Sequence, residues 1–285
     1  MTAAIHRVDF GAGAARAALP VDETARAAEN LFREAPDTAA LDALAGPAPL
    51  LAIDDLFAGY GRMEILHGVS LRVGAGQSLC LIGPNGAGKS TVLHSICGLC
   101  DVRSGAITVG GRDITALSAN EKLARAGIAY ILQDNSVFPD MTVEENLLMG
   151  GFLLRRPAEA REAAERMLQK YDRLAQRRNQ AARVLSGGER RLLEIVRALI
   201  MNPRILLVDE PSIGLEPRFI DMVFDILRDL QRDQGKTIVM VEQNAKKGLG
   251  FADIGYVLVS GRIARAGSGS DLLANPDVGR LFLGG

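Results

Sequence analysis

The sequence predicts an α/β fold built on a mainly parallel β-sheet. Three short runs of apolar and β-branched residues are typical of strands buried on both faces, at Ile205–Val208, Thr237–Val241 and Ile254–Val259. They alternate with helical patterns such as Arg218–Arg232. Alternating strands and helices favour a parallel sheet that is covered by helices.

The N-terminal half of this region adds shorter elements in order. Leu50–Phe57 and Ile65–Val73 alternate apolar and polar residues like half-buried strands, which predicts an antiparallel β part. Ser78–Ile82 is an apolar strand before a glycine-rich turn and a helix that begins at about Lys89. Two further strands are expected at Ala106–Val109, before a Gly-Gly turn, and at Gly127–Leu132.

The middle of the chain reads as a helical insert. Helical patterns dominate from Thr142 to about Ile200, so residues 135–200 are expected to form a helical subdomain within one domain, 50–285. Residues 1–49 differ, because they are rich in alanine and end in the linker-like Ala-Gly-Pro-Ala-Pro at 45–49. Val21–Glu34 is a weak amphipathic helix candidate in this extension, which is either mobile or lightly docked; a regulatory or docking role is the alternative.

Composition and net charge argue against several classes of protein. Of 285 residues, 48% are hydrophobic and 24% charged, as in ordinary globular proteins. The formal net charge of −1 gives no support for nucleic-acid binding, so we expect no nucleic-acid partner. We find no apolar run of membrane-spanning length and no secretory signal, and therefore expect a cytosolic chain that can dock on a membrane protein.

The three cysteines do not suggest a disulfide framework or a metal site. They are Cys80, Cys97 and Cys100, an odd number. Cys97 and Cys100 form a C-x-x-C pair, but no second pair or histidine cluster completes a zinc site. We interpret the pair as part of a helix end.

The strongest motif is a glycine-rich segment between a strand and a helix. It fits G-x-x-x-x-G-K-[ST] and consists of Gly83, Pro84, Asn85, Gly86, Ala87, Gly88, Lys89, Ser90 and Thr91. Its glycines let backbone N–H groups approach phosphates, and the following helix adds its positive dipole end. Lys89 is expected to contact the β- and γ-phosphates and Ser90 to bind Mg²⁺. This pattern predicts nucleotide binding.

An acidic pair follows the apolar strand at 205–208. Asp209 and Glu210 end the strand, at the edge where the phosphate loop of such sheets lies. Asp209 can hold Mg²⁺ through water. Glu210 points the other way and can orient or deprotonate the attacking water. The two residues therefore predict hydrolysis as well as binding.

A second anion-binding helix start occurs about a hundred residues after the first. In Leu185-Ser-Gly-Gly-Glu-Arg-Arg191, Ser186 and Glu189 form a capping box, and Gly187 and Gly188 expose backbone N–H groups. The capping box alone is a structural explanation. The glycines additionally favour a second phosphate contact.

Together these segments resemble the ABC ATPase family over about Leu50–Gly285. Gly83–Thr91 resembles its Walker A motif, Ile205–Glu210 its Walker B motif and Leu185–Gly188 its signature motif. The resemblance implies the P-loop ABC ATPase fold and a head-to-tail dimer with a second ATPase subunit. In it, Ser186, Gly187 and Gly188 of one subunit would grip the ATP of the other.

The resemblance assigns three further positions. Gln133 matches the glutamine that contacts Mg²⁺ and water and senses the membrane partner. Tyr60 matches the aromatic residue that stacks on adenine, and Ser212–Pro217 occupies the D-loop position. Gln243 stands where the family usually has a histidine near the γ-phosphate. Its amide can donate a hydrogen bond but cannot carry a proton charge, so turnover is expected to be slower or to depend more on Glu210.

Some stretches are similar to the ATPase subunits of branched-chain (hydrophobic) amino acid and amide importers. They are Phe138–Leu147, Ser212–Pro217 and Val241–Ala245. This resemblance implies permease subunits, an indirect role for an extracytoplasmic solute-binding protein and a peripheral place on the cytoplasmic face of the membrane. Urea, amide or lipid cargo and a soluble non-transport ATPase are the alternatives. At Asp134–Met141 an apolar patch would contact the permease, or else pack locally.

Overall fold

Two β-sheets form the framework of the molecule. The structure, a computed structural model, describes residues 35–133 and 136–283. The antiparallel sheet has the order β2-β1-β4-β5, and the larger sheet has the order β10-β9-β3-β8-β7-β6. In the larger sheet β9, β3, β8, β7 and β6 are parallel, while β10 runs antiparallel to β9. The predicted α/β fold, with a mainly parallel core and an antiparallel part, is confirmed.

The strands agree closely with the sequence expectations. Their bounds are β1 Leu51–Tyr60, β2 Met63–Val73, β3 Ser78–Ile82, β4 Asp101–Val109, β5 Arg112–Asp113, β6 Ile128–Ile131, β7 Ile205–Asp209, β8 Thr237–Val241, β9 Ile254–Val259 and β10 Arg262–Ser268. β3, β7, β8 and β9 are buried along their whole length, as expected for parallel strands covered on both faces. The half-exposed β10 and the two-residue β5 were not predicted, because both lie at sheet edges and lack a clear apolar pattern.

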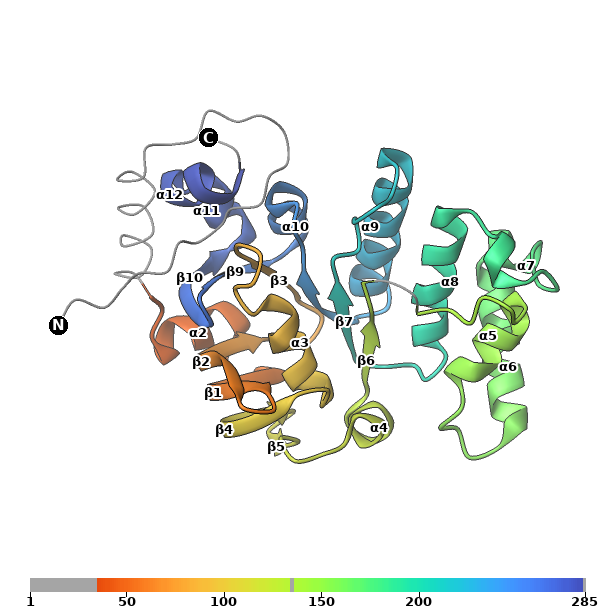
Figure 1. The fold of residues 1–285 in the computed structure, drawn as a ribbon, viewed down its shortest axis with the longest axis horizontal. Coiled ribbons are helices and arrows are strands. Elements are labelled where there is room, and N and C mark those ends of the chain that lie inside the picture. Colours follow the sequence, from red (N-terminus) through yellow and green to blue (C-terminus); the bar gives the residue numbers. More distant parts are fainter. Residues whose placement is uncertain (1–34, 134–135, 284–285) are drawn as a thin grey trace.

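The helices cover the sheet and build a separate group. Their bounds are α2 Thr38–Ala45, α3 Lys89–Cys97, α4 Ala119–Glu121, α5 Val143–Gly150, α6 Pro157–Lys170, α7 Asp172–Ala175, α8 Gly187–Leu199, α9 Pro217–Arg232, α10 Ala245–Phe251, α11 Gly269–Ala274 and α12 Pro276–Val278. Short 3₁₀ and π turns lie at Lys122–Ala126, Ala182–Val184 and Gly279–Leu283. Figure 1 shows α5, α6 and α7 on the far side of α8 from the parallel sheet.

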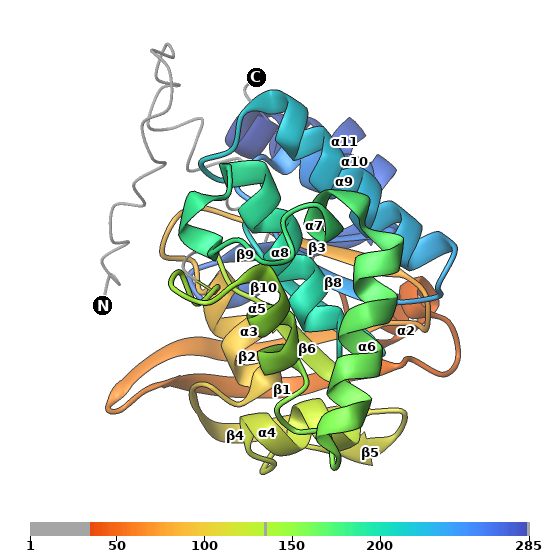
Figure 2. The same ribbon diagram turned by 90° about the vertical axis from the view of Figure 1, so that its right-hand side faces the viewer.

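The helical group has a core of its own. Buried apolar side chains of α5, α6, α7 and α8 pack together there, including Leu147, Leu168, Leu174 and Leu193. Both α5 and α8 begin with a complete capping box, at Thr142/Glu145 and Ser186/Glu189. In Figure 2 this group faces the viewer, in front of the strands. This group comprises α5, α6, α7 and α8.

A helix in the expected extension packs against the domain. Asp37 caps α2 by accepting a hydrogen bond from the backbone N–H of Ala40. Leu41 of this helix is only 1% exposed and belongs to the main core. Sequence reasoning ended the domain at residue 50 and did not find α2, because one buried turn of a short alanine-rich helix gives little periodic signal. The helix candidate Val21–Glu34 lies outside the described residues.

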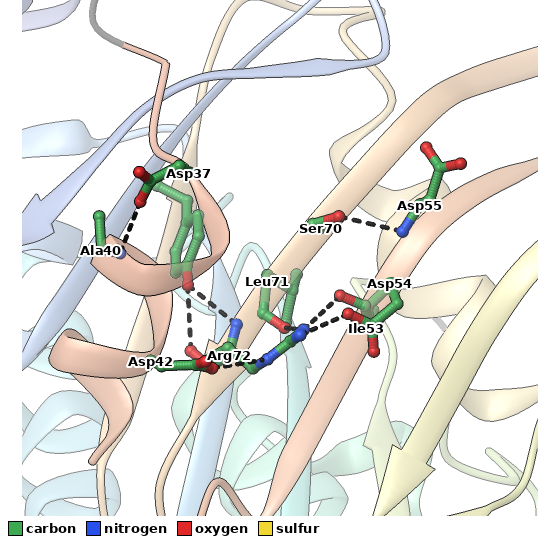
Figure 3. A network of polar contacts seen from close by, with 10 residues as sticks. Asp37, Ala40, Asp42, Ile53, Asp54, Asp55, Ser70, Leu71 and Arg72 are labelled. Atoms are coloured by element: carbon green, nitrogen blue, oxygen red, sulfur yellow. Dashed lines mark hydrogen bonds and ion pairs between the residues drawn. The ribbon is translucent and has the colours of Figure 1, made fainter. Parts of the chain in front are cut away.

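A buried arginine connects α2 to both sheets (Figure 3). Arg72 of β2 pairs with Asp42 of α2 and with Asp54 of β1. Its guanidinium also donates to the carbonyl oxygen of Ile53 at 2.6 Å, and its backbone exchanges hydrogen bonds with the hydroxyl of Tyr256 in β9. This network holds the end of the extension against the β framework.

Candidate functional site

The phosphate loop connects β3 to α3. Gly88 precedes α3 with a φ of +101°, a left-handed conformation that favours glycine, and it lies under Leu66. Lys89 begins the helix, and its ammonium donates to the carbonyl oxygens of Gly83 and Pro84 at 3.0 and 3.1 Å. Burial lowers the pKa of Lys89, while the nearby carboxylates of Glu210 and Asp209 act in the opposite direction. The lysine is therefore a buried cation held at the rim of the loop.

The carboxylates at the end of β7 lie beside this loop. Ser90 donates a hydrogen bond from its hydroxyl to Asp209 at 3.2 Å. Glu210 follows with a φ of +42°, which turns the chain sharply after the strand. Gln133, which follows β6, donates from its side-chain amide to Glu210 at 3.2 Å. Residues from three separate parts of the sequence thus meet at one edge of the parallel sheet.

A cavity of about 410 Å³ joins most of the predicted residues. Its lining consists of Ile65, Asn85, Gly86, Gly88, Lys89, Ser90, Thr91, Gln133, Glu210, Ile213 and Gln243. Gln243 follows β8 and is exposed, so its amide is free to turn toward a ligand in this cavity. One basic, one acidic and several amide or hydroxyl side chains converge here, a combination suited to a polyanion with its counter-ion.

The signature segment lies at the start of α8 and outside that cavity. Ser186 caps the helix, and Ser186 and Gly187 are exposed. Gly188 is buried under the ring of Phe219 in α9, where a Cβ would collide with the ring. The exposed part of this helix start therefore consists of Ser186 and Gly187.

Comparison with known proteins identifies this arrangement. The profile of the ABC transporter family matches residues 66–213, which include the phosphate loop, the signature segment and both carboxylates. The chain belongs to the ABC transporter family. The predicted family is thereby confirmed, and as a cassette of this family the chain is an ATPase coupled to transport.

Two relatives within the ABC transporter family indicate which kinds of transporter ATPase this chain resembles. The chain is 42% identical to the high-affinity branched-chain amino acid transport ATP-binding protein BraG of Pseudomonas aeruginosa, over 83% of this chain and 100% of BraG. It is 37% identical to the lipopolysaccharide export system ATP-binding protein LptB of Acidithiobacillus ferridurans, over 82% of this chain and 97% of LptB. Both kinds of transporter ATPase therefore resemble this cassette.

Solved ABC cassettes share the fold. A nucleotide-free ATP-binding cassette from an ABC transporter superposes with a TM-score of 0.74 at 29% identity, over 83% of this chain and 100% of that chain. A dimeric cassette in a post-hydrolysis state, bound to ADP and phosphate, superposes with a TM-score of 0.67 at 26% identity, over 76% of this chain and 98% of that chain. Within the described parts of this ABC cassette, we find no helix with the length and apolar character of a membrane span.

Tyr60, the predicted adenine-stacking residue of this ABC cassette, lies near α3 and not among the residues that line the cavity. It ends β1, is 40% exposed and contacts His94 Nδ1 through its hydroxyl. The rings of His94 and Tyr130 meet edge to face at 5.7 Å, and Tyr130 donates to Asp209 at 2.7 Å. His94 and Tyr130 were not predicted, since a single histidine on a helix and a tyrosine in a strand give no pattern of their own.

Glu242 is a second residue that sequence reasoning missed in this ABC cassette. It follows β8, is buried, and accepts hydrogen bonds from the hydroxyl of Ser212 at 2.7 Å and from the backbone N–H of Asn244 at 2.9 Å. It therefore connects the D-loop segment to the turn that carries Gln243. Its position directly after an apolar strand, like that of Asp209 and Glu210, was the available signal.

In the segment after Gln133, one apolar side chain is buried and the next is exposed. Val137 is buried in the core of the helical group, whereas Phe138 is exposed. Phe138 lines a second cavity of about 420 Å³ together with Leu99, Met149 and Phe152. Of these, Phe152 is 76% exposed. Val137 therefore packs locally inside the helical group, whereas Phe138 lies in an open, largely apolar groove.

The cysteine pair lies at a helix end, as expected. Cys97 closes α3 and Cys100 follows it. Burial raises the pKa of the Cys97 thiol to about 12, so this cysteine is a neutral, weakly reactive thiol at neutral pH.

Proposed function

We propose that this ABC cassette hydrolyses Mg-ATP in the 410 Å³ cavity. The observation that supports this most directly is the meeting of Lys89, Ser90, Gln133, Glu210 and Gln243 around one space. The backbone N–H groups of Gly86–Ser90 and the start of α3 face the triphosphate, and the ammonium of Lys89 neutralises the β- and γ-oxygens. Tyr60 supplies an aromatic surface beside α3 for the adenine ring.

The residues that would hold Mg²⁺ have suitable chemistry. The hydroxyl of Ser90 and the carboxylate of Asp209 lie 3.2 Å apart, and Gln133 adds an amide oxygen. All three offer oxygen ligands, which fit Mg²⁺. When bound, Mg²⁺ neutralises charge on the phosphates. Tyr130 holds the second oxygen of Asp209 and thereby keeps the first oxygen turned toward Ser90.

Glu210 is proposed to position the attacking water. Its carboxylate accepts a hydrogen bond from Gln133, so the amide sets the direction of the remaining oxygen. Gln243, beside it on the cavity wall, can donate a hydrogen bond to the γ-phosphate but cannot exchange a proton. Proton transfer from water then depends on Glu210.

Replacing Glu210 tests this assignment. We expect Glu210→Gln to bind ATP while hydrolysis falls by at least about a hundredfold, because the amide orients water but cannot accept its proton. Steady-state phosphate release and nucleotide binding measure the two effects. Glu162→Gln, which changes an exposed acid on α6, is the matched control. Hydrolysis by Glu210→Gln at the rate of the unchanged protein would refute the assignment.

The exposed start of α8 supports a head-to-tail dimer. Ser186 and Gly187 present a helix N-terminus to the outside, where the ATP of a second ABC ATPase subunit can meet it. The partner is a paralogue or a second copy. In Glu210→Gln the ATP-bound dimer should persist, and size-exclusion chromatography with and without Mg-ATP would show its accumulation.

The second cavity is proposed as the contact for permease subunits at the cytoplasmic face of the membrane. Its exposed apolar side chains, Phe138, Met149, Phe152 and Leu99, suit an apolar segment of a partner. An extracytoplasmic solute-binding protein would act indirectly through the permease. The open-to-closed motion of the dimer would reach the permease through the segment after Gln133.

Branched-chain or other hydrophobic amino acids are the proposed cargo, and the similarity to BraG supports this choice. The similarity to LptB favours an exported lipid as the second candidate. Uptake of radiolabelled leucine, isoleucine and urea should be compared in cells with and without this chain. Loss of leucine uptake supports the first candidate; unchanged uptake of all three, with altered surface lipid, supports the second.

A further inference from the structure

A buried ion pair lies inside α8, one turn after the signature segment. Arg191 donates to Glu194 at 2.7 Å, and both side chains are only 6% exposed. The residues are three positions apart on one helix, so the pair by itself joins no elements. Its position is informative because of what else the guanidinium contacts.

The guanidinium of Arg191 reaches two segments outside the helical group. One terminal nitrogen also donates to the carbonyl oxygen of Leu132 at 2.7 Å, and the other donates to the carbonyl oxygen of Asp209 at 3.3 Å. Leu132 directly precedes Gln133, and Asp209 directly precedes Glu210. The side chains of Gln133 and Glu210 are hydrogen-bonded to each other. One side chain of α8 therefore fixes the backbone on both sides of the Gln133–Glu210 contact.

Stability alone does not account for this pair. Burying two charges costs free energy that their attraction seldom exceeds, and apolar replacements of such pairs are often neutral or stabilising. The Nε of Arg191 is also buried, and it has no hydrogen-bond partner among residues 35–133 and 136–283. The pair is costly to bury, yet the guanidinium donates to two backbone carbonyl groups. This indicates that the pair serves to hold those two backbone segments in position.

The pair also borders the second cavity. Glu194 lines that cavity together with Tyr130, Phe138 and Arg197. Arg191 and Glu194 thus lie between the groove at the surface and the Gln133–Glu210 contact.

We propose that Arg191 is a positioning residue for ATP hydrolysis. Glu194 orients its guanidinium, and the guanidinium holds the backbone next to Gln133 and Glu210 at a fixed position relative to α8. This inference rests on the proposed roles of Gln133 and Glu210. ATP binding does not require it, because none of the contacts of Arg191 involves the phosphate loop.

The test uses the complex that the full chain forms with its native partner subunits, purified through a tag on this chain. Arg191→Met with Glu194→Gln removes both charges together, which avoids an unpaired buried charge. We expect its kcat to fall about tenfold or more, while the KM for ATP stays within about threefold, because small displacements at a reacting centre cost rate before affinity. Arg191→Lys alone keeps the charge and can reach one carbonyl group, so it should recover part of the lost rate.

A matched pair and a binding measurement separate positioning from folding. Arg178→Met with Glu144→Gln removes a bidentate ion pair that lies within the same helical group but contacts neither Leu132 nor Asp209, and it should keep the unchanged kcat. The number of ATP molecules bound per chain should be the same in all variants. A kcat for the Arg191 pair within about twofold of this control, or a rate that falls only in proportion to bound ATP, overturns the inference.

The outcome is distinguishable from a failure of the proposed function. If Glu210→Gln keeps full hydrolysis in the same complex, the assignment of the catalytic carboxylate is wrong, whatever the Arg191 variants do. If Glu210→Gln is inactive and the Arg191 pair matches its control, only the positioning role is wrong.

Discussion

At the scale of single residues, a row of polar and aromatic side chains leads from the surface to the carboxylate of Asp209. Tyr60 contacts His94, His94 packs on Tyr130, and Tyr130 donates to Asp209. Burial lowers the pKa of His94 from its usual value of 6.5, and the charge of Asp209 opposes this only in part. The imidazole is therefore expected to be neutral at pH 7.

This depressed pKa predicts a pH dependence of stability. Between the folded-state pKa and about 6.5 the unfolded chain binds more protons at His94, so stability is lost as the pH falls through this window. We expect His94→Gln to flatten the decline in the free energy of unfolding between about pH 7.5 and 5.5. Urea unfolding at both pH values measures this. An unchanged slope in the variant would assign the pH dependence to other groups.

At the scale of elements, the start of α8 shows that two adjacent glycines have different roles. A Cβ at Gly187 would meet only Leu215, at an ordinary 3.9 Å, whereas a Cβ at Gly188 would collide with the ring of Phe219 in α9. Gly188 thus allows α8 and α9 to approach each other. Gly187 is free to serve a contact outside the molecule.

Alanine substitutions distinguish these two roles. We expect Gly188→Ala to lower the free energy of unfolding by about 1–2 kcal/mol, because the Phe219 ring must move aside. Gly187→Ala should leave stability unchanged or slightly higher, since alanine favours helix more than glycine does. Thermal unfolding compares the variants. Adding Phe219→Leu should recover part of the loss at Gly188; no recovery would mean that the ring is not the cause.

At the scale of the whole molecule, α2 is part of the domain although the sequence placed it in the extension. Leu41 packs into the core that the antiparallel and parallel sheets share, and Arg72 pairs with Asp42 on the same helix. The stability of the domain is therefore expected to depend on residues before position 50.

Truncating Leu41 tests this dependence. Leu41→Ala should lower the free energy of unfolding by about 2–4 kcal/mol, because it removes buried methyl groups and leaves a cavity between α2 and the sheets. Val184→Ala is the control, since Val184 is 62% exposed and its truncation should cost little. Chemical denaturation of both variants gives the comparison. Equal stabilities would mean that α2 contributes little to the folded domain.

Local sequence patterns determined much of the fold and most of the candidate site. β3, β8 and β9 have the bounds that the apolar runs predicted, because strands buried on both faces must be continuously apolar. Lys89, Ser90, Asp209 and Glu210 were identifiable for a similar reason. A phosphate loop and a carboxylate after a buried strand each need fixed residue types at fixed spacing.

Only the tertiary structure decided which of these pieces touch, and through which residues. Arg191, Glu242, Tyr130 and His94 act on partners 18 to 79 positions away or on carbonyl groups of distant segments, and such contacts leave no periodic trace in the chain. The packing of α2 depends in the same way on a surface that β2 and β10 create only after folding. The sequence by itself therefore determined the parts that obey local rules of hydrogen bonding and burial. The positions of buried polar groups were decided by the fold, because each must find a partner wherever the folded chain provides one.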